Sequence, residues 1–411
     1  MKRVVITGMG IISPIGNSIE TFWNNLLEGK SGISNIESID VSDLNTKIAG
    51  EVKNFDPEGR WGLKEARRLS RFAQFALAAA EQAFEQSQLI LENINSERIG
   101  VYVGTAAGGI PTLVDNVDYL NHRGPSRVNP NLMSMMIDNM AAAHISIRFG
   151  ALGPSLAPAT ACSVGTTAIG EAYKAIQNND ADIIFAGGSE AAITKVVLAS
   201  FSNSKALSTK NDVPTSASRP FDVDRDGFVM SEGAAVLILE SLEHALMRDA
   251  PIFGEIIGYA SNSDAYHQIA SHPEGKGAFL AMRNALLNAG ITIDEVDVIN
   301  AHATSTKVGD ISETMAINKL FKERAEKIPV SANKSTTGHL LGAAGAAEAI
   351  ALLKTLEEDL IPPTINVENL DPKVNLNIVT KKESIKNLNI GLSNSFGFGG
   401  HSSVIVLRKY Q

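Results

Sequence analysis

Cysteine and long apolar runs are scarce in this chain. Among 411 residues there is one cysteine, Cys162, which excludes an intramolecular disulfide and a metal cluster built from several thiolates. No apolar run approaches the ~20 residues that a transmembrane helix needs, and no signal-peptide cleavage site follows the first apolar residues. We therefore expect a cytoplasmic protein without membrane association, in which any chemistry at Cys162 is that of a single thiol.

An excess of positive charge is also missing. The chain has 36 Lys and Arg against 45 Asp and Glu, a net charge of −9, which argues against nucleic acid as a partner because phosphate binding needs a cationic surface. An acidic partner would need a local basic patch. The length exceeds the usual size of a single core, so we expect two lobes, residues 1–250 and 251–411, which share one body because no flexible linker separates them.

Short apolar runs that end in small residues alternate with alanine-rich stretches of helical composition. Such runs occur at 98–109, 181–192 and 296–306, and residues 67–87 are typical of the helices between them. This alternation predicts an α/β protein built from βαβ units with buried strands. Segments 160–176 and 335–356 both enter a small-residue helix through a Ser/Thr/Gly turn, which indicates a weak internal duplication.

Cys162 is predicted to lie at the start of a buried helix. Ala168, Ala172 and Ile176 follow it at helical spacing, and the polar residues 177–180 end the pattern. Backbone N–H groups and the helix dipole favour a thiolate at such a start, so we expect a lowered thiol pKa and a nucleophile. The competing interpretation is a small buried residue in a tight turn, because free cysteines are among the most buried residues.

Two histidines and a lysine favour the catalytic interpretation. His302 ends an apolar strand, and Lys334 and His339 lie around another strand-to-helix turn. Functional groups of α/β sheets gather at the carboxyl ends of strands, where we expect these residues. The glycine-rich segment 393–409 leads into a terminal strand, and its N–H groups could bind an oxyanion, although a plain hairpin would use the same residues.

Taken together, these motifs make the chain similar to the β-ketoacyl-acyl-carrier-protein synthases of the condensing-enzyme family, most closely the elongating type of dissociated fatty-acid synthesis. The resemblance covers the whole length and rests on TACS (160–163), SRPFDVDRDGFVMSEGAA (218–235), NAHATST (300–306), GHLLGAAG (338–345) and SNSFGFGG (393–400). It implies a thiolase-like fold of two duplicated βαβαβαββ-type lobes in a five-layer αβαβα arrangement. It also implies a homodimer, and a heterodimer with a related subunit stays open.

The resemblance further implies roles in a decarboxylative Claisen condensation. Cys162 would hold the acyl chain as a thioester, and His302 and His339 would assist decarboxylation of malonyl-acyl-carrier protein. The backbone N–H groups of Cys162 and Phe398 would form the oxyanion hole. The remaining implied residues are Lys334 and Glu313, which would orient the histidines, Thr304 and Thr306, which would bind phosphopantetheine, and Phe201, Phe398 and Ala107, which would line the acyl pocket. Neither a metal nor an organic cofactor is expected.

A basic patch for an acidic acyl carrier protein is predicted in the first lobe. Lys64, Arg67, Arg68 and Arg71 fall at helical spacing, opposite an apolar face, and form one cationic stripe. Such a stripe is usually a solvated helix face, but here it suggests carrier docking, with Lys205 as an addition.

Several positions depart from the family pattern and keep alternatives open. Ala303 stands where many bacterial members have glycine, and Ile269 and Ala270 replace a Thr-Ser pair, so some pantetheine contacts are in doubt. Ala107 predicts a wide acyl pocket, which leaves a ketosynthase of a type II polyketide or polyene pathway as the second hypothesis. A third is a non-catalytic partner subunit, although such subunits usually lack the cysteine. A biosynthetic thiolase would need a second cysteine, and a starter-type synthase would have asparagine in place of His339.

Overall fold

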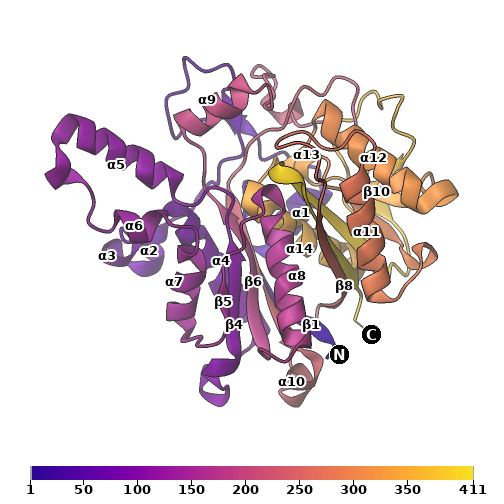
Figure 1. Ribbon diagram of the computed structural model, residues 1–411, viewed down its shortest axis with the longest axis horizontal. Helices are drawn as coiled ribbons and strands as arrows, with labels where there is room; N and C mark the ends of the chain where they lie inside the picture. The colour runs from indigo at the N-terminus through magenta and orange to yellow at the C-terminus, as the bar shows by residue number, and fades with distance from the viewer. Residues whose placement is uncertain (1, 411) are drawn as a thin grey trace.

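An eleven-stranded sheet runs through the computed structural model, which describes residues 2–410 (Figure 1). The elements up to residue 250 are β1 (Val4–Ile12), α1 (Ile19–Leu27), β2 (Ser34–Asn35), β3 (Ile48–Ala49), α2 (Pro57–Trp61), α3 (Leu63–Ala66), α4 (Arg71–Ser87), β4 (Ile99–Gly104), α5 (Ile110–Arg123), α6 (Leu132–Met136), α7 (Met140–Phe149), β5 (Ser155–Leu156), α8 (Val164–Gln177), β6 (Ile183–Glu190), α9 (Lys195–Asn203), β7 (Gly233–Ser241) and α10 (Leu242–Met247). Those after it are β8 (Gly254–Ser263), α11 (Lys276–Ala289), β9 (Val298–Asn300), α12 (Lys307–Phe321), β10 (Pro329–Ser331), α13 (Lys334–Thr337), α14 (Ala344–Glu358), β11 (Leu360–Ile361), β12 (Asn377–Ile378), β13 (Glu383–Ser384), β14 (Ile390–Gly397) and β15 (His401–Arg408).

The sheet repeats one topology in its two halves. The strand order is β5-β4-β6-β7-β1 in the first half and β8-β15-β14-β9-β10-β12 in the second, and β1 pairs with β8 in antiparallel fashion to join them. In each half the last two long strands are antiparallel, β6 with β7 and β14 with β15. The predicted duplication is therefore confirmed. The boundary at residue 250 stays a prediction, because hydrogen bonds of the sheet run across it.

Helices divide the two halves into five layers. In the first half, α4 and α7 cover the outer face of the sheet, and α11 does so in the second half with α12 packed beside it. Between the halves, α8 and α14 contact strands of both, so they form the central layer (Figure 1). Strands covered on both sides are largely apolar, and all nine residues of β1 and of β7 are buried. The αβαβα arrangement is confirmed.

The starts of α8 and α14 meet at glycines. A Cβ at Gly165 of α8 would lie 2.8 Å from the backbone nitrogen of Ala346, and one at Gly345 of α14 would lie 2.1 Å from Thr166 Oγ1. A side chain fits at neither position, so the close approach requires glycine. The small-residue patterns of the two segments thus bring together the starts of two helices, one from each half.

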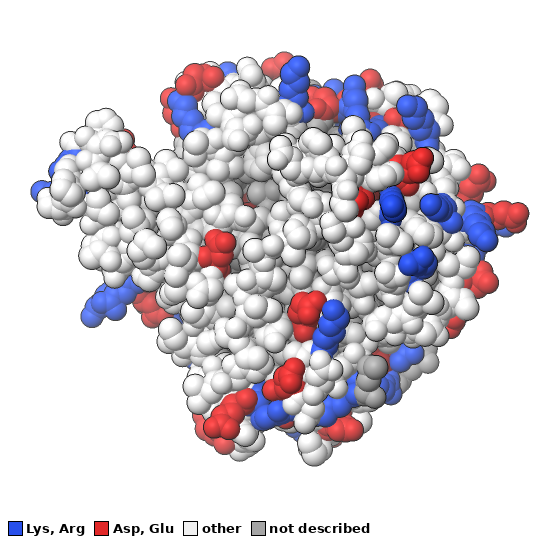
Figure 2. Space-filling view, viewed as in Figure 1, with Lys and Arg blue, Asp and Glu red and all other residues white. Residues whose placement is uncertain are grey.

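One face of the molecule carries few charged side chains. Figure 2 shows that charge is sparse over the face formed by α5, α7 and α8, where α5 projects from the body (Figure 1). Large apolar side chains are exposed on α5, α6, α7 and around β5: Leu113, Val117, Leu120, Met133, Ile137, Ile147, Leu152 and Leu156. Within residues 2–410, none of the helices has the length and apolar character needed to cross a bilayer.

Candidate active site

Cys162 lies in a single 3-10 turn, residues 161–163, directly before α8. Ala161 has a φ of 49°, a conformation that L residues rarely adopt, and this tight turn presents the thiol at the helix start. Cys162 is buried, with 8% of its surface exposed. The predicted place of the thiol, at the N-terminal end of a buried helix, is confirmed.

The expected lowering of the thiol pKa is wrong. Burial raises the pKa of Cys162 to about 12, because it penalises the charged thiolate more than its surroundings favour it. Lys334 and the backbone N–H groups of Phe398 and Cys162 act in the lowering direction, whereas Glu190 raises the pKa further. The thiol of the free protein is therefore protonated at neutral pH and must lose its proton as the sulfur attacks.

The two N–H groups predicted to form an oxyanion hole converge on the thiol. Phe398 begins the tight turn that joins β14 to β15, and its backbone N–H and that of Cys162 lie near enough to the sulfur to act on the thiol, both in the direction that lowers its pKa. This approach needs glycine at 397, because a Cβ there would lie 2.6 Å from the Thr160 carbonyl oxygen. The glycine-rich segment is thus a hairpin, as one interpretation predicted, and its turn also presents an N–H at the site.

His302 and His339 face each other as neutral imidazoles. His302 follows β9, His339 lies between α13 and α14, and their ring centroids are 5.5 Å apart with the planes nearly perpendicular. Burial lowers the pKa of both rings well below the usual range, and the positive charge of Lys334 lowers it further. Lys334 Nζ donates to His302 Nδ1 at 3.3 Å, so the ring proton of neutral His302 lies on Nε2, where it can be donated to a ligand.

Lys334 pairs with a residue that sequence reasoning missed. Its ammonium forms a buried ion pair with Glu348 of α14, not with Glu313 as the resemblance implied. Glu313 instead accepts the backbone N–H groups of His302 at 3.0 Å and of Ala303 at 2.8 Å, so it holds the loop that carries His302. Burial raises the pKa of Glu348 to about 7, although the ammonium opposes this. The available signal was a lone acidic residue within the buried, alanine-rich segment 343–353.

An apolar cavity of about 750 Å³ opens beside the thiol. It lies between α5 and α9 and contains the three predicted pocket residues, with the Phe201 and Phe398 rings 6.1 Å apart. Its lining consists of Ala106, Ala107, Ile110, Leu113, Val114, Val117, Ala161, Cys162, Ala192, Val196, Val197, Ser200, Phe201, Leu341 and Phe398. A lining of this kind suits a long hydrocarbon chain attached to Cys162.

Comparisons with known proteins agree with this geometry. Residues 1–245 match the description "Beta-ketoacyl synthase, N-terminal domain", and residues 253–368 match its C-terminal domain. The chain belongs to the β-ketoacyl synthase family. It is 47% identical to 3-oxoacyl-[acyl-carrier-protein] synthase 2 from Synechocystis sp. and to that from Staphylococcus aureus, in each case over 100% of this chain and 99% of the relative. A type II PKS ketosynthase, solved in complex with its acyl-carrier protein and bound to the hexaketide, superimposes with a TM-score of 0.91 at 34% identity and full coverage of both chains.

The threonines predicted for the pantetheine arm lie next to His302. Thr304 and Thr306 are partly buried, and their hydroxyl oxygens are 3.1 Å apart. Thr306 also caps α12 by accepting the backbone N–H of Gly309, so one of the two hydroxyls has a structural task as well. Both follow the strand end that positions His302, which places them on the side of the site formed by the second half.

The predicted basic helix does not exist as one element. Lys64 belongs to the four-residue α3, Arg67 and Arg68 lie in the turn after it, and α4 begins at Arg71, because Leu69 and Ser70 turn the chain inward. Arg71 is paired with Glu232 at 2.6 Å. Lys64, Arg67 and Arg68 remain exposed, and Lys205 is exposed after α9, where it lines a separate polar cavity.

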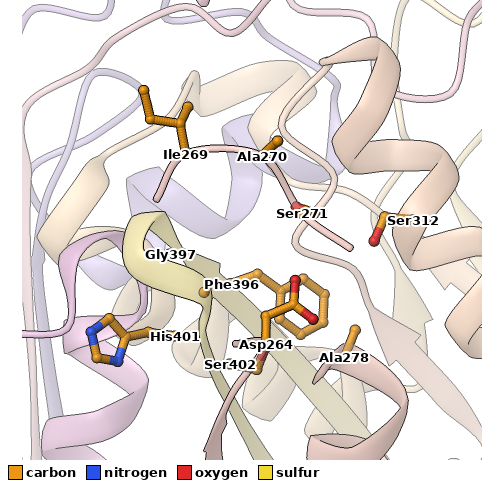
Figure 3. Close-up of a pocket in the computed structure, with 11 residues that line it drawn as sticks. Asp264, Ile269, Ala270, Ser271, Ala278, Ser312, Phe396, Gly397, His401 and Ser402 are labelled. Atoms are coloured by element: carbon orange, nitrogen blue, oxygen red, sulfur yellow. The ribbon is translucent and has the colours of Figure 1, made fainter. Parts of the chain in front are cut away.

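The departures Ile269 and Ala270 lie on a loop packed against the Gly399 turn. The backbone N–H of Gly399 donates to the Gln268 carbonyl at 2.8 Å, and that of Asp264 donates to the Gly400 carbonyl at 2.7 Å. Figure 3 shows this loop above the turn, with Asp264 beneath it and the His401 ring projecting to the other side. The small cavity under the loop is lined by both departures, so an apolar pair stands where hydroxyls commonly occur.

Four buried side-chain oxygens without a hydrogen-bond partner in the described chain are the groups that could hold a cation. Asn300 Oδ1, Ser393 Oγ, Asn394 Oδ1 and Glu348 Oε2 are buried without a hydrogen-bond partner in the described chain, and Asn300 pairs with Ser393 across β9 and β14. Oxygen donors of this type suit hard cations. Among residues 2–410 no group of three or more His, Cys, Asp or Glu side chains is placed to hold a metal. The expectation of no metal is untested and stays a prediction.

Proposed function

We propose that the chain catalyses the decarboxylative condensation of a Cys162-bound acyl chain with malonyl-acyl-carrier protein, giving 3-ketoacyl-acyl-carrier protein and carbon dioxide in fatty-acid elongation. The observation that carries the proposal is the placement of one thiol in the lining of an apolar cavity, beside two neutral histidines and two converging N–H groups. The name shared by the relatives with 47% identity supports the same reaction.

In the first half-reaction Cys162 takes the acyl group from its carrier. The sulfur attacks the thioester carbonyl, and the N–H groups of Cys162 and Phe398 bind the oxyanion that forms. The carrier's carbon–sulfur bond then breaks, and the proton lost by the thiol ends on the departing pantetheine sulfur. The acyl chain extends into the cavity between α5 and α9, past Phe201 and Phe398.

In the second half-reaction the histidine pair stabilises an enolate. The malonyl carbon–carbon bond breaks, carbon dioxide leaves, and the electron pair of the broken bond passes into an enolate. The Nε2–H of His302 and a ring N–H of His339 donate hydrogen bonds to the enolate oxygen. The enolate carbon attacks the acyl-thioester carbonyl, and the Cys162 sulfur leaves and is reprotonated. The carboxylate carbon that becomes carbon dioxide is oxidised and the thioester carbon that becomes a ketone is reduced by the same amount. The reaction therefore has no net oxidation or reduction and calls for no redox cofactor, and we propose that none is used.

The chemistry of the cavity favours a hydrocarbon chain over a poly-β-ketone. Among its described lining residues, Ser200 and Cys162 have the polar side chains, and the others are aliphatic or aromatic. Each carbonyl of a polyketone would lose its hydrogen bonds with water in such a lining, at a cost of roughly 1–3 kcal/mol each. The second candidate is a ketosynthase of a type II polyketide or polyene pathway, which the similarity to a type II PKS ketosynthase supports. Of these two pathways the lining favours the polyene, because a polyene chain carries no such carbonyls.

Intact-protein mass spectrometry tests the proposal. The protein is incubated with acyl-carrier proteins that bear saturated, polyene or ketone-containing chains, and then with malonyl-carrier. We expect saturated long-chain adducts that discharge to 3-ketoacyl-carrier. Preferential loading of polyene chains would favour the second candidate. The absence of any adduct would favour the third hypothesis, a non-catalytic partner subunit in which Cys162 has a structural role.

Filling the space at Ala107 should shorten the accepted chain. The Ala107→Phe side chain would project into the cavity next to Phe398, so acyl transfer from long-chain carriers is expected to fall at least tenfold while short chains still load. The measurement is the initial rate of adduct formation for carriers of graded length, with Ala106→Ser as the control that adds little volume. Equal losses for short and long chains would show that the variant damages the thiol rather than the chain site.

Reversing charge at the exposed arginines should weaken carrier docking. Arg67 and Arg68 are solvent-exposed next to Lys64, and an acidic carrier would be attracted to them. In Arg67→Glu/Arg68→Glu we expect a KM for acyl-carrier substrate raised about tenfold, with a kcat within twofold of the parent. Acyl-pantetheine without the carrier protein provides the control, because its KM should not change. An unchanged carrier KM would contradict docking at this surface.

We also propose that the chain forms a homodimer through the face with few charges. The exposed apolar residues of α5 to α7 lie there, and both residues of the edge strand β5 are exposed. An apolar face of this kind and an unpaired strand edge are both costly in water, and a second copy would cover both. Sedimentation of Leu152→Lys/Leu156→Lys is expected to give monomers.

A further inference from the structure

The carboxylate of Glu190 joins two chain segments that meet at the site. Glu190 ends β6 and is fully buried. Its Oε2 accepts the backbone N–H of Ala106 at 3.0 Å and that of Gly342 at 3.1 Å, and its Oε1 accepts the Thr105 hydroxyl at 3.1 Å. The first segment lies in the turn before α5, and the second lies in the turn before α14.

Both segments form part of the reacting centre. Ala106 and Leu341 line the acyl cavity with Cys162, and the chain runs from His339 through Leu341 into Gly342. Leu341 has a φ of 47°, and a Cβ at Gly342 would lie 2.7 Å from the Ala106 nitrogen, so the two turns are in close contact and one of them is strained. Because the Glu190 carboxylate accepts hydrogen bonds from both turns, it fixes the cavity wall relative to the turn that carries His339.

The Glu190 carboxylate binds the two turns that line the cavity together with Cys162, and from there its negative charge acts on the thiol. Within residues 2–410 no basic side chain pairs with its carboxylate, so its charge is balanced by hydrogen bonds alone. The charged groups that act on Cys162 are Lys334 and Glu190, in opposite directions, while His302 and His339 are neutral. Burial raises the pKa of Glu190 to about 7, so its charge changes near neutral pH.

We propose that Glu190 is a positioning residue of the condensation. Its hydrogen bonds hold the wall of the acyl cavity against the His339 turn, and its negative charge disfavours the Cys162 thiolate before substrate arrives. This inference rests on the proposed function for the identity of the reaction. The structural tie and the charge can be separated by substitution. In Glu190→Gln the amide oxygen can still accept from Ala106 and Gly342 while the charge is lost, whereas Glu190→Ala removes both.

Thiol reactivity tests the charge. Because the chain has one cysteine, the mass gained with methyl methanethiosulfonate reports Cys162 alone. At pH 8.5, where Glu190 is ionised, we expect Glu190→Gln to react roughly tenfold faster than the parent, the effect of one unit of thiol pKa. At pH 5.5 the two rates should converge, because the parent carboxyl is then protonated. Glu240→Gln, another fully buried glutamate, on β7, is the control for a lost buried charge and should match the parent at both pH values.

Chain-length selectivity tests the structural link that Glu190 makes between the two turns. Glu190→Gln should keep the parent's preference among acyl-carriers of graded length, and Glu190→Ala should lose it and decarboxylate malonyl-carrier at least tenfold more slowly. If Glu190→Ala does not fold, Thr105→Val removes one donor and should give a smaller loss of selectivity, with Thr105→Ser as its control. Parental thiol rates in Glu190→Gln at pH 8.5, or parental selectivity in Glu190→Ala and Thr105→Val, would overturn the proposal. A parent that forms no acyl adduct would instead refute the proposed function.

Discussion

Cys162→Ala should form no acyl adduct with any carrier and should condense at least roughly 10⁴-fold more slowly than the parent, the scale on which losing a nucleophile acts in acyl-transfer enzymes. The cause is direct, because this thiol is the chain's one cysteine and lines the acyl cavity. Intact mass after acyl-carrier addition and the rate of 3-ketoacyl-carrier formation are the measurements.

The same variant should retain decarboxylation of malonyl-carrier. The histidine pair, Lys334 and the Phe398 turn are independent of the sulfur atom, so carbon dioxide release without condensation is expected to continue. Thermal denaturation should show a folded protein, since a thiol-to-methyl change removes little volume. If an acyl adduct formed on Cys162→Ala, another residue would have to be the nucleophile.

Lys334→Met should destabilise the fold and stop decarboxylation. It leaves the Glu348 carboxylate buried without its ammonium, a change that typically costs about 3–5 kcal/mol. It also removes the donor that fixes the proton of His302 on Nε2, so enolate stabilisation should fall at the same time. Chemical denaturation gives the free energy of unfolding, and carbon dioxide release from malonyl-carrier gives the chemistry.

A double variant separates these two effects. Lys334→Met/Glu348→Leu contains neither charge, and replacing a buried ion pair by apolar residues of similar volume is often neutral or stabilising. We expect its free energy of unfolding to return to within about 1 kcal/mol of the parent, while decarboxylation stays lost. Recovery of decarboxylation together with stability would mean that Lys334 acts only through folding.

The sequence predicted the fold and the reacting groups because both leave local marks. The spacing of Ala168, Ala172 and Ile176 predicts the helix start at Cys162. His302 comes directly after an apolar run that is recognisable as a buried strand. The duplicated halves were visible as two similar small-residue segments, which became α8 and α14.

What the sequence did not predict depends on tertiary surroundings. The pKa of Cys162 is set by how completely the site is buried, which a helix-start argument does not include. The partner of Lys334 could not be chosen between Glu313 and Glu348, because both are buried near it and only the packing of α14 decides. The basic helix failed because Leu69 and Ser70 turn inward between α3 and α4, a break that periodicity alone does not reveal.

The repeat topology has a consequence for how this chemistry could be encoded. The turn with Cys162 precedes α8, and the turn with His339 precedes α14, so the two groups occupy equivalent points in the two halves. A symmetric pair of identical lobes would carry the same residue at both points, either two nucleophiles or two enolate-binding imidazoles. Because both halves belong to one chain but have their own sequences, each can carry its own residue at this point, and the single chain can therefore hold the asymmetric pair that the reaction requires.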